Sequence, residues 1–115
     1  MAVDAFVVLA EPTRRRILEV LRTADQSVGE LSSALEVNQP TMSKHLRVLR
    51  EAGFVSCRTA AQQRIYRIET RPLVAIDAWL EPYRLLWTHH LDALAHHLDR
   101  QHERQHERQH TQEER

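Results

Sequence analysis

Residues 27–53 constrain the fold of this chain more than any other stretch, because their turn signals frame two short helices. Ser27 and Glu30 have the spacing of a capping box, in which the Ser hydroxyl accepts a backbone hydrogen bond and the Glu side chain reaches back. Asn38 is predicted to cap a second helix, and Gly53 is predicted to follow its C-cap. Two helices joined by a tight turn make a helix-turn-helix.

Shorter elements flank this stretch on both sides. A short apolar helix is expected over residues 3–9, and Pro12 suits the first position of another helix. Apolar and polar residues alternate over residues 54–59 and 64–69, which predicts two strands with a hairpin tip at residues 60–63. We therefore expect a mainly α fold with a small two-stranded β-wing, which is a winged helix-turn-helix.

A long last helix is predicted to begin after Thr70, which can cap it. Its apolar residues recur at steps of three or four, which keeps them on one face, and Pro82 lies inside it. Trp79 and Trp87 add more apolar surface than a monomer is expected to cover, although the alternative is that this helix packs only on its own domain. We expect a homodimer through the first and last helices. The predicted seam consists of Val3, Phe6, Val7, Leu73, Ile76, Leu80, Tyr83, Trp87 and Leu91.

The chain changes character after residue 99. The sequence then repeats Gln-His-Glu-Arg, offers no apolar residue for burial, and places like charges such as Glu103 and Glu107 four positions apart. We predict one winged helix-turn-helix domain over residues 1–99 and a polar low-complexity tail over residues 100–115. This tail is expected to be frayed or disordered from residue 101.

The charges of the chain are unevenly placed, although its net charge is zero. Residues 12–67 hold ten Lys or Arg and five Asp or Glu, which is a local excess of five positive charges. A DNA backbone responds to the local field, so a basic face on a neutral chain still favours nucleic-acid binding.

The second helix of the helix-turn-helix is amphipathic. Met42, Leu46 and Leu49 fall on one face, which we expect to pack in the core. The outward face runs from Pro40 to Arg47, is short-chained and cationic, and holds no acidic side chain.

This chemistry suits a helix in the DNA major groove, where such side chains read base edges and neutralise phosphates. An Arg- and Gln-rich hairpin would contact the minor groove. A charged helix face is often merely solvated, but a capped helix-turn-helix followed by a basic hairpin favours DNA binding. The predicted DNA-binding residues are Gln39, Thr41, Ser43, Lys44, His45, Arg47, Arg58, Gln62, Gln63 and Arg64.

Three motifs, at residues 9–18, 28–31 and 39–55, resemble those of the ArsR family of winged helix-turn-helix repressors. The Ser-Lys-His-Leu sequence at residues 43–46 is the most specific of these features, and the resemblance covers residues 5–98. It implies a homodimer that binds a promoter palindrome, often the protein's own. The Trp-rich last helix is most similar to a non-metal-sensing branch of the family.

Metal-sensing members of that family carry ligands that this chain lacks. The resemblance places a Cys pair within residues 27–31, where this chain has none, and thiolates are the ligands that soft metals need. A second family site would combine Asp77 and His90 with ligands at Trp79 and Ala93, which cannot bind metal. We expect no metal and no cofactor.

Two alternative functions stay open. A metal- or effector-responsive repressor would use histidines of the last helix and tail, since histidines four apart on a helix can chelate Ni²⁺, Cu²⁺ or Zn²⁺. A winged helix can also serve protein–protein contact alone. An enzyme is not expected, because no Ser/His/Asp or Cys/His set is placed to cooperate.

The single cysteine, Cys57, allows no intrachain disulfide and is interpreted as a buried structural residue. No signal peptide or long apolar run is evident. These features predict a cytoplasmic protein with no membrane partner. The expected partners are double-stranded DNA and a second copy of the chain.

Overall fold

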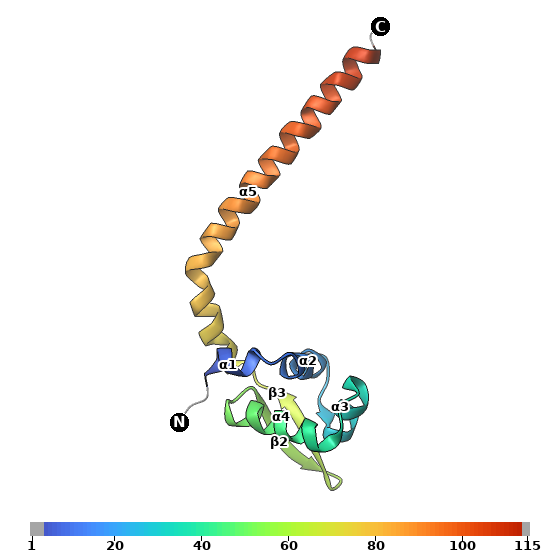
Figure 1. Cartoon of the computed structure of the whole chain (residues 1–115), viewed down its shortest axis with the longest axis vertical. Coiled ribbons are helices and arrows are strands. Elements are labelled where there is room, and N and C mark those ends of the chain that lie inside the picture. The colour runs from blue at the N-terminus through green and yellow to red at the C-terminus, as the bar shows by residue number, and fades with distance from the viewer. Residues whose placement is uncertain (1–3, 114–115) are drawn as a thin grey trace. The chain divides into compact units, whose positions relative to one another are not determined.

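The computed structural model describes residues 4–113, with side-chain surroundings for residues 4–106 (Figure 1). The chain divides into two compact units, residues 1–78 and 79–115. Val3, a predicted seam residue, lies outside the described residues. The elements are α1 (Ala5–Leu9), α2 (Pro12–Leu21), β1 (Gln26–Ser27), α3 (Val28–Leu35), α4 (Gln39–Glu51), β2 (Val55–Ala60), β3 (Gln63–Ile68) and α5 (Arg71–Glu113). The mainly α winged helix-turn-helix predicted from the sequence is confirmed.

The predicted caps begin and end the helices of the helix-turn-helix. The Ser27 hydroxyl accepts a hydrogen bond from the Glu30 amide at 3.1 Å, and the Glu30 carboxylate accepts one from the Ser27 amide at 3.0 Å. The Asn38 side chain accepts one from the Thr41 amide at 2.9 Å. Gly53 follows α4 with a φ of 81°, a left-handed conformation that favours glycine.

The turn between α3 and α4 contains a left-handed residue other than glycine. Glu36 has φ 56° and ψ 43°, and the Val37 amide donates a hydrogen bond to the Ser32 carbonyl at 3.1 Å. This Schellman-type arrangement closes α3. It allows α4 to begin three residues after Glu36, in a new direction.

The inner face of α4 lies at the centre of the core. Met42, Leu46 and Leu49 are fully buried, as predicted, against side chains from α1, α2, α3 and the sheet. The buried cluster consists of Val8, Ile17, Leu18, Leu21, Leu31, Leu35, Met42, Leu46, Leu49, Phe54, Val55 and Tyr66. Its burial determines which face of α4 meets solvent.

A third strand, β1, joins the predicted two-stranded ribbon. The sheet is antiparallel with the order β1-β3-β2, and Ser27 of β1 pairs with Ile65 of β3. A strand of two residues is too short to show a period-two pattern, so the sequence analysis missed it. Because Ser27 also caps α3, the wing and the helix-turn-helix share this residue.

The hairpin tip is tighter than predicted. Ala60 pairs with Gln63, which leaves a two-residue turn of Ala61 and Gln62. Both turn residues have positive φ, 50° and 68°. Two positive φ angles are what a type I′ hairpin turn requires, since its twist matches that of the strands.

Helix α5 continues through the Gln-His-Glu-Arg repeat to Glu113, so the prediction of a frayed tail from residue 101 is wrong. Gln, Glu and Arg are good helix formers. The sequence also places opposite charges such as Arg100 and Glu103 three positions apart. The prediction gave too much weight to the like-charge pairs.

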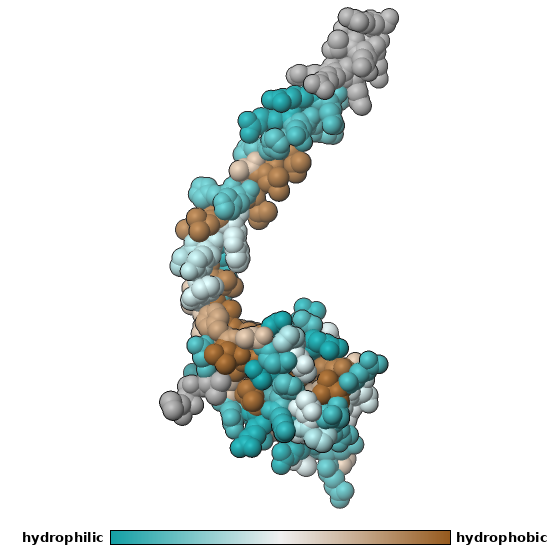
Figure 2. Space-filling model, in the orientation of Figure 1, coloured by the Kyte–Doolittle hydropathy of each residue, from teal (hydrophilic) through white to brown (hydrophobic). Residues whose placement is uncertain are grey.

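Large apolar side chains remain exposed in the unit formed by residues 79–115, where Figure 2 shows apolar surface at intervals along the helix. The rings of Trp79 and Tyr83 lie 4.7 Å apart between centroids. No helix among the described residues has the length and apolarity needed to cross a membrane. The exposed apolar residues of this unit are Trp79, Tyr83, Leu85, Leu86, Trp87, Leu91, Leu94 and Leu98.

Removal of the cap of α4 should destabilise the protein. We expect Asn38→Ala to lower the free energy of unfolding by about 1 kcal/mol, because the Thr41 amide loses its acceptor. Urea denaturation of both proteins measures this difference. Asn38→Asp retains an acceptor and should stay within about 0.5 kcal/mol of the parent. Equal losses for the two variants would contradict the capping role.

Candidate nucleic-acid interface

The outward face of α4 is exposed as the amphipathic pattern predicts. With the apolar residues of α4 in the core, Gln39, Thr41, Ser43, Lys44 and Arg47 are all exposed. Four of these side chains can donate hydrogen bonds to base edges or phosphates from the first two turns of the helix, and Arg47 adds a guanidinium one turn later.

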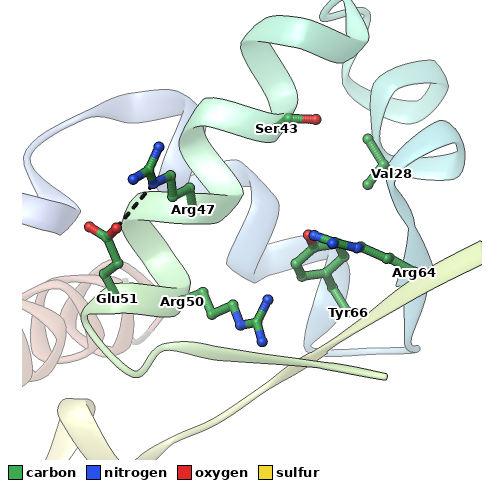
Figure 3. Close-up of a pocket in the computed structure, with 7 residues that line it drawn as sticks. All are labelled: Val28, Ser43, Arg47, Arg50, Glu51, Arg64 and Tyr66. Carbon is green, nitrogen blue, oxygen red and sulfur yellow. Dashed lines mark hydrogen bonds and ion pairs between the residues drawn. The ribbon is translucent and has the colours of Figure 1, made fainter. Parts of the chain in front are cut away.

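A groove of about 660 Å³ lies between α4 and the β3 strand (Figure 3). Ser43 and Arg47 line it from α4, and Arg64 lines it from β3, so predicted residues from the helix and the wing meet here. The full lining consists of Val28, Ser43, Arg47, Arg50, Glu51, Arg64 and Tyr66.

Four of the lining residues, Val28, Arg50, Glu51 and Tyr66, were not predicted as site residues. Arg50 follows Ser43 and Arg47 at helical spacing of four and then three positions, so the signal was present in the sequence. Tyr66 is buried in the core and borders the groove from below Arg64 on the same strand face. The groove is therefore lined by three arginines and a largely buried tyrosine, and Figure 3 shows the Arg47 side chain directed toward Glu51.

The outward face of α4 ends in an acidic residue. Glu51 is the last residue of α4, one turn beyond Arg47, and its Oε1 lies 3.1 Å from the Arg47 Nε. The Arg47 side chain is 81% exposed and the Glu51 side chain 54%. The prediction that this face holds no acid is correct only as far as Arg47.

The predicted wing residues divide between two faces of the ribbon. Arg64 pairs with Thr59, whereas Arg58 pairs with Ile65, one position away. Because neighbouring strand positions point to opposite faces, Arg58 lies on the face opposite to Arg64. Its guanidinium forms an ion pair with Asp25 at 2.7 Å.

The two glutamines of the wing are exposed at its tip. Gln62 lies in the turn, and Gln63 begins β3. Gln63 and Arg64 also line a smaller groove of about 300 Å³, together with Gly29 and Gln39. The wing tip therefore lies near the start of α4.

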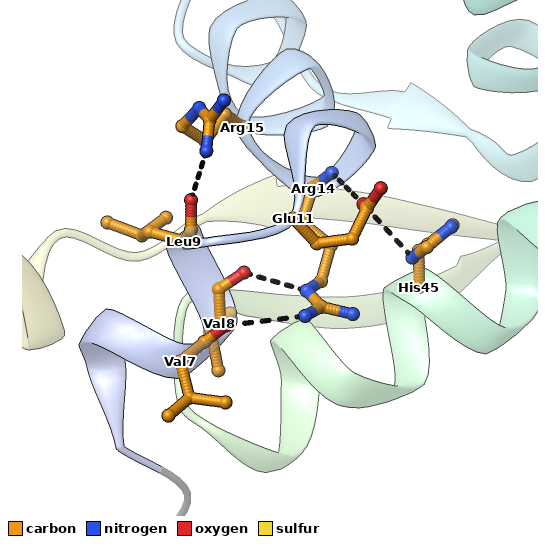
Figure 4. A network of polar contacts seen from close by, with 7 residues as sticks. All are labelled: Val7, Val8, Leu9, Glu11, Arg14, Arg15 and His45. Carbon is orange, nitrogen blue, oxygen red and sulfur yellow. Dashed lines mark hydrogen bonds and ion pairs between the residues drawn. The ribbon is translucent and has the colours of Figure 1, made fainter.

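His45 is oriented differently from its neighbours on α4. Its side chain is only 19% exposed, and its Nδ1 lies 3.6 Å from Oε2 of Glu11 (Figure 4). The same Glu11 oxygen accepts a hydrogen bond from the Arg14 amide at 3.1 Å and so caps α2. His45 thus contacts the N-terminus of another helix.

Two arginines of α2 continue this network toward α1. The Arg14 Nε donates to the Val8 carbonyl at 2.7 Å, and the Arg15 guanidinium donates to the Leu9 carbonyl. These carbonyls belong to the last turn of α1, which has no further intrahelical donors. Polar contacts therefore connect α4 to α2 and α2 to α1.

The pKa of Glu11 reflects these contacts. Partial burial acts to raise it, but hydrogen bonds from the Arg14 and Thr13 amides and the nearby His45 and Arg14 charges outweigh burial. The pKa of Glu11 consequently lies below its ordinary value of 4.5.

Within the part of the chain whose side chains are described, no three His, Cys, Asp or Glu residues are grouped so that they could hold a metal ion.

The sequence predicts that Cys57 is buried, but the structure shows it only half-buried. Its Sγ lies 4.0 Å from the Arg58 carbonyl oxygen.

Comparison with known proteins gives consistent matches. Residues 11–56 match the family described as "Bacterial regulatory protein, arsR family". The HTH-type transcriptional regulator Rv2034 of Mycobacterium tuberculosis is 36% identical over 97 residues, covering 84% of this chain and 88% of that protein. The transcriptional repressor SdpR of Bacillus subtilis is 29% identical over 77 residues, covering 67% of this chain and 86% of that protein. The crystal structure of an ArsR family transcriptional regulator, RHA00566, matches with a TM-score of 0.65 and 31% identity, covering 76% of this chain and 97% of that chain.

The fold and its basic groove define a winged helix-turn-helix regulator that binds DNA. The chain belongs to the ArsR family of bacterial transcriptional regulators. This confirms the family resemblance read from the sequence. It also confirms that the protein is a regulator and not an enzyme, because the matching family and relatives are transcriptional regulators.

The lowered pKa of Glu11 predicts a pH-dependent stability difference. An ionised Glu11 is favoured in the folded state, so its contribution is complete above pH 4.5 and is lost as the pH falls through the lower folded pKa. We expect Glu11→Gln to destabilise the protein at pH 7 and the difference from the parent to shrink as the pH falls through the lowered pKa of Glu11.

Urea denaturation at a series of pH values measures this effect. Glu19→Gln, a change of an exposed acid on the same helix, provides the matched control. A difference between parent and Glu11→Gln that is the same at pH 7 and pH 3 would show that the carboxylate charge has no role.

Proposed function

We propose that the protein represses transcription by binding a pseudo-palindromic DNA operator as a homodimer. The groove between α4 and β3 carries this proposal, because Arg47 and Arg50 of the helix and Arg64 of the wing all line it. Arginines on both walls of a groove beside an exposed polar helix face are suited to a phosphate backbone that borders a major groove.

In this proposal α4 enters the major groove. Gln39, Thr41 and Ser43 lie in its first turns and would contact base edges, since amide and hydroxyl groups can both donate and accept hydrogen bonds. Lys44 and Arg47 would contact phosphates on one side of the groove or a guanine edge.

The wing would follow the backbone into the adjacent minor groove. Gln62, Gln63 and Arg64 are exposed at or near its tip and are proposed to make these contacts. Arg58 and His45 stay predictions as DNA contacts. Arg58 would have to leave Asp25, and His45 would have to leave Glu11, before either reached DNA.

The proposed dimer uses α1 and α5. Phe6 and Val7 are 41% and 60% exposed on α1, and Tyr83, Trp87 and Leu91 expose large apolar surfaces on α5. Exposed apolar surface of this extent is typical of an interface, and a homodimer is typical of the family. Leu80 is half-buried, and Leu73 and Ile76 pack partly against the core of their own unit.

A twofold dimer would bind two half-sites about 34 Å apart, which is one turn of DNA. The relative SdpR is named as a transcriptional repressor, which supports repression as the outcome of binding. The promoter of the protein's own gene is the proposed first target. A fluorescence-anisotropy titration with that promoter and with a scrambled duplex tests the proposal.

Loss of a cation from the outward face of α4 should weaken DNA binding. We expect Lys44→Ala and Arg47→Ala each to raise the Kd for the promoter duplex about tenfold. Each should also reduce the slope of log Kd against log salt concentration by about one, which corresponds to one phosphate contact. Arg16→Ala removes an exposed cation from α2 as the control and should leave the Kd within about twofold. Unchanged affinity in both α4 variants would favour a protein-binding module instead.

A charge in the middle of the seam should dissociate the dimer. We expect Trp87→Glu to shift the protein to monomers in sedimentation velocity, because a carboxylate cannot be buried unpaired in an apolar interface. Leu85→Glu is the matched control, since Leu85 is exposed on α5 outside the predicted seam. A Trp87→Glu protein that stays dimeric would exclude this part of α5 from the interface.

A further inference from the structure

Glu51 is placed where local rules disfavour an acid. It is the last residue of α4, and a negative charge at a helix C-terminus interacts unfavourably with the helix dipole. Its i,i+4 pair with Arg47 also runs in the less favourable order, with the basic residue before the acidic one. Helix stability therefore gives little reason for a carboxylate at this position.

The groove itself gives a second reason against an acid. Glu51 is the one acidic residue among the seven that line it, and it pairs with Arg47, one of the three arginines in the lining. A carboxylate in a groove that accepts a DNA backbone repels phosphate. The residue is thus unfavourable both for the helix and for a bound polyanion.

The contact between Glu51 and Arg47 indicates what the carboxylate does. The Arg47 Nε is 3.1 Å from Glu51 Oε1, which is a hydrogen-bonded ion pair of the kind that a guanidinium also makes with a phosphate oxygen. Both side chains are more than half exposed, so a phosphate can reach the same guanidinium. The carboxylate engages only the Nε–H, so the Nη groups of Arg47 can still bind a phosphate, but the negative charge of Glu51 offsets the attraction of this guanidinium for a second anion.

We propose that Glu51 limits the affinity of this protein for DNA, because its carboxylate pairs with the Arg47 guanidinium and its charge weakens the attraction of that guanidinium for a DNA phosphate. This inference rests on the proposed function, since it requires DNA in the groove between α4 and β3. A phosphate of a duplex of any sequence must either share the Arg47 guanidinium with this carboxylate or displace the carboxylate from it. Glu51 is therefore an affinity-determining residue that makes no attractive contact with DNA.

The test compares wild type with Glu51→Gln, an uncharged side chain of similar size. We expect Glu51→Gln to bind both the promoter and the scrambled duplex about two- to fivefold more tightly, which corresponds to the release of an exposed ion pair. Its thermal midpoint should be unchanged or higher, because the charge at the C-terminus of α4 is removed. Fluorescence anisotropy and thermal denaturation measure the two effects.

Two comparisons separate the ion pair from a general change in charge. In an Arg47→Ala background, Glu51→Gln should increase affinity by less than about half the factor seen with Arg47 present, because only long-range repulsion is then relieved. Glu19→Gln, with the same charge change on α2, should increase affinity by less than about twofold.

An equal gain with and without Arg47, an equal gain for Glu19→Gln, or a lowered thermal midpoint of Glu51→Gln would each overturn the inference. Unchanged DNA affinity of Glu51→Gln would overturn the inference as well. The proposed function would still stand in that case, provided that the wild-type protein binds the promoter duplex. Absence of any duplex binding by wild type would instead overturn both proposals.

Discussion

The burial of Met42, Leu46 and Leu49 is the constraint on which the rest of the structure depends. All three are fully buried, and complete burial of each such side chain stabilises a protein by about 1.5–3 kcal/mol. Rotation of α4 about its axis would expose them, so the opposite face of the helix has to meet solvent. That face carries the polar and cationic residues, and the position of α4 against β3 then produces the groove with Arg64.

Some basic residues near the interface contact acidic residues of the protein, and each contact has a different consequence. His45 is half-buried against Glu11, which joins α4 to the start of α2. Arg58 is held by Asp25 on the face of the ribbon opposite to the groove. The excess of five positive charges counted from the sequence already subtracts Asp25, so what the structure adds is the position of this acid, which compensates Arg58 away from the groove.

Sequence analysis correctly predicted the helix caps, which depend on residues that are close together in the sequence. The capping box at Ser27 and the cap at Asn38 depend on residues three positions apart, and both formed as predicted. The orientation of His45 could not be predicted, because its partner Glu11 is far away in the sequence. The predicted site residues from α4 and the wing meet in one groove only through the tertiary packing, so Tyr66 was missed as a lining residue, whereas the helical spacing of Arg50 from Ser43 and Arg47 could have identified it.

The most direct test of the account is a comparison of backbone amide NMR shifts before and after addition of a duplex that carries the promoter of the protein's own gene. The account predicts that the largest changes fall in α4, at residues 39–47, and at the wing tip, at residues 61–64. Changes confined to α1 and α5, with α4 and the wing unaffected, would contradict the assignment of the groove between α4 and β3 as the DNA interface.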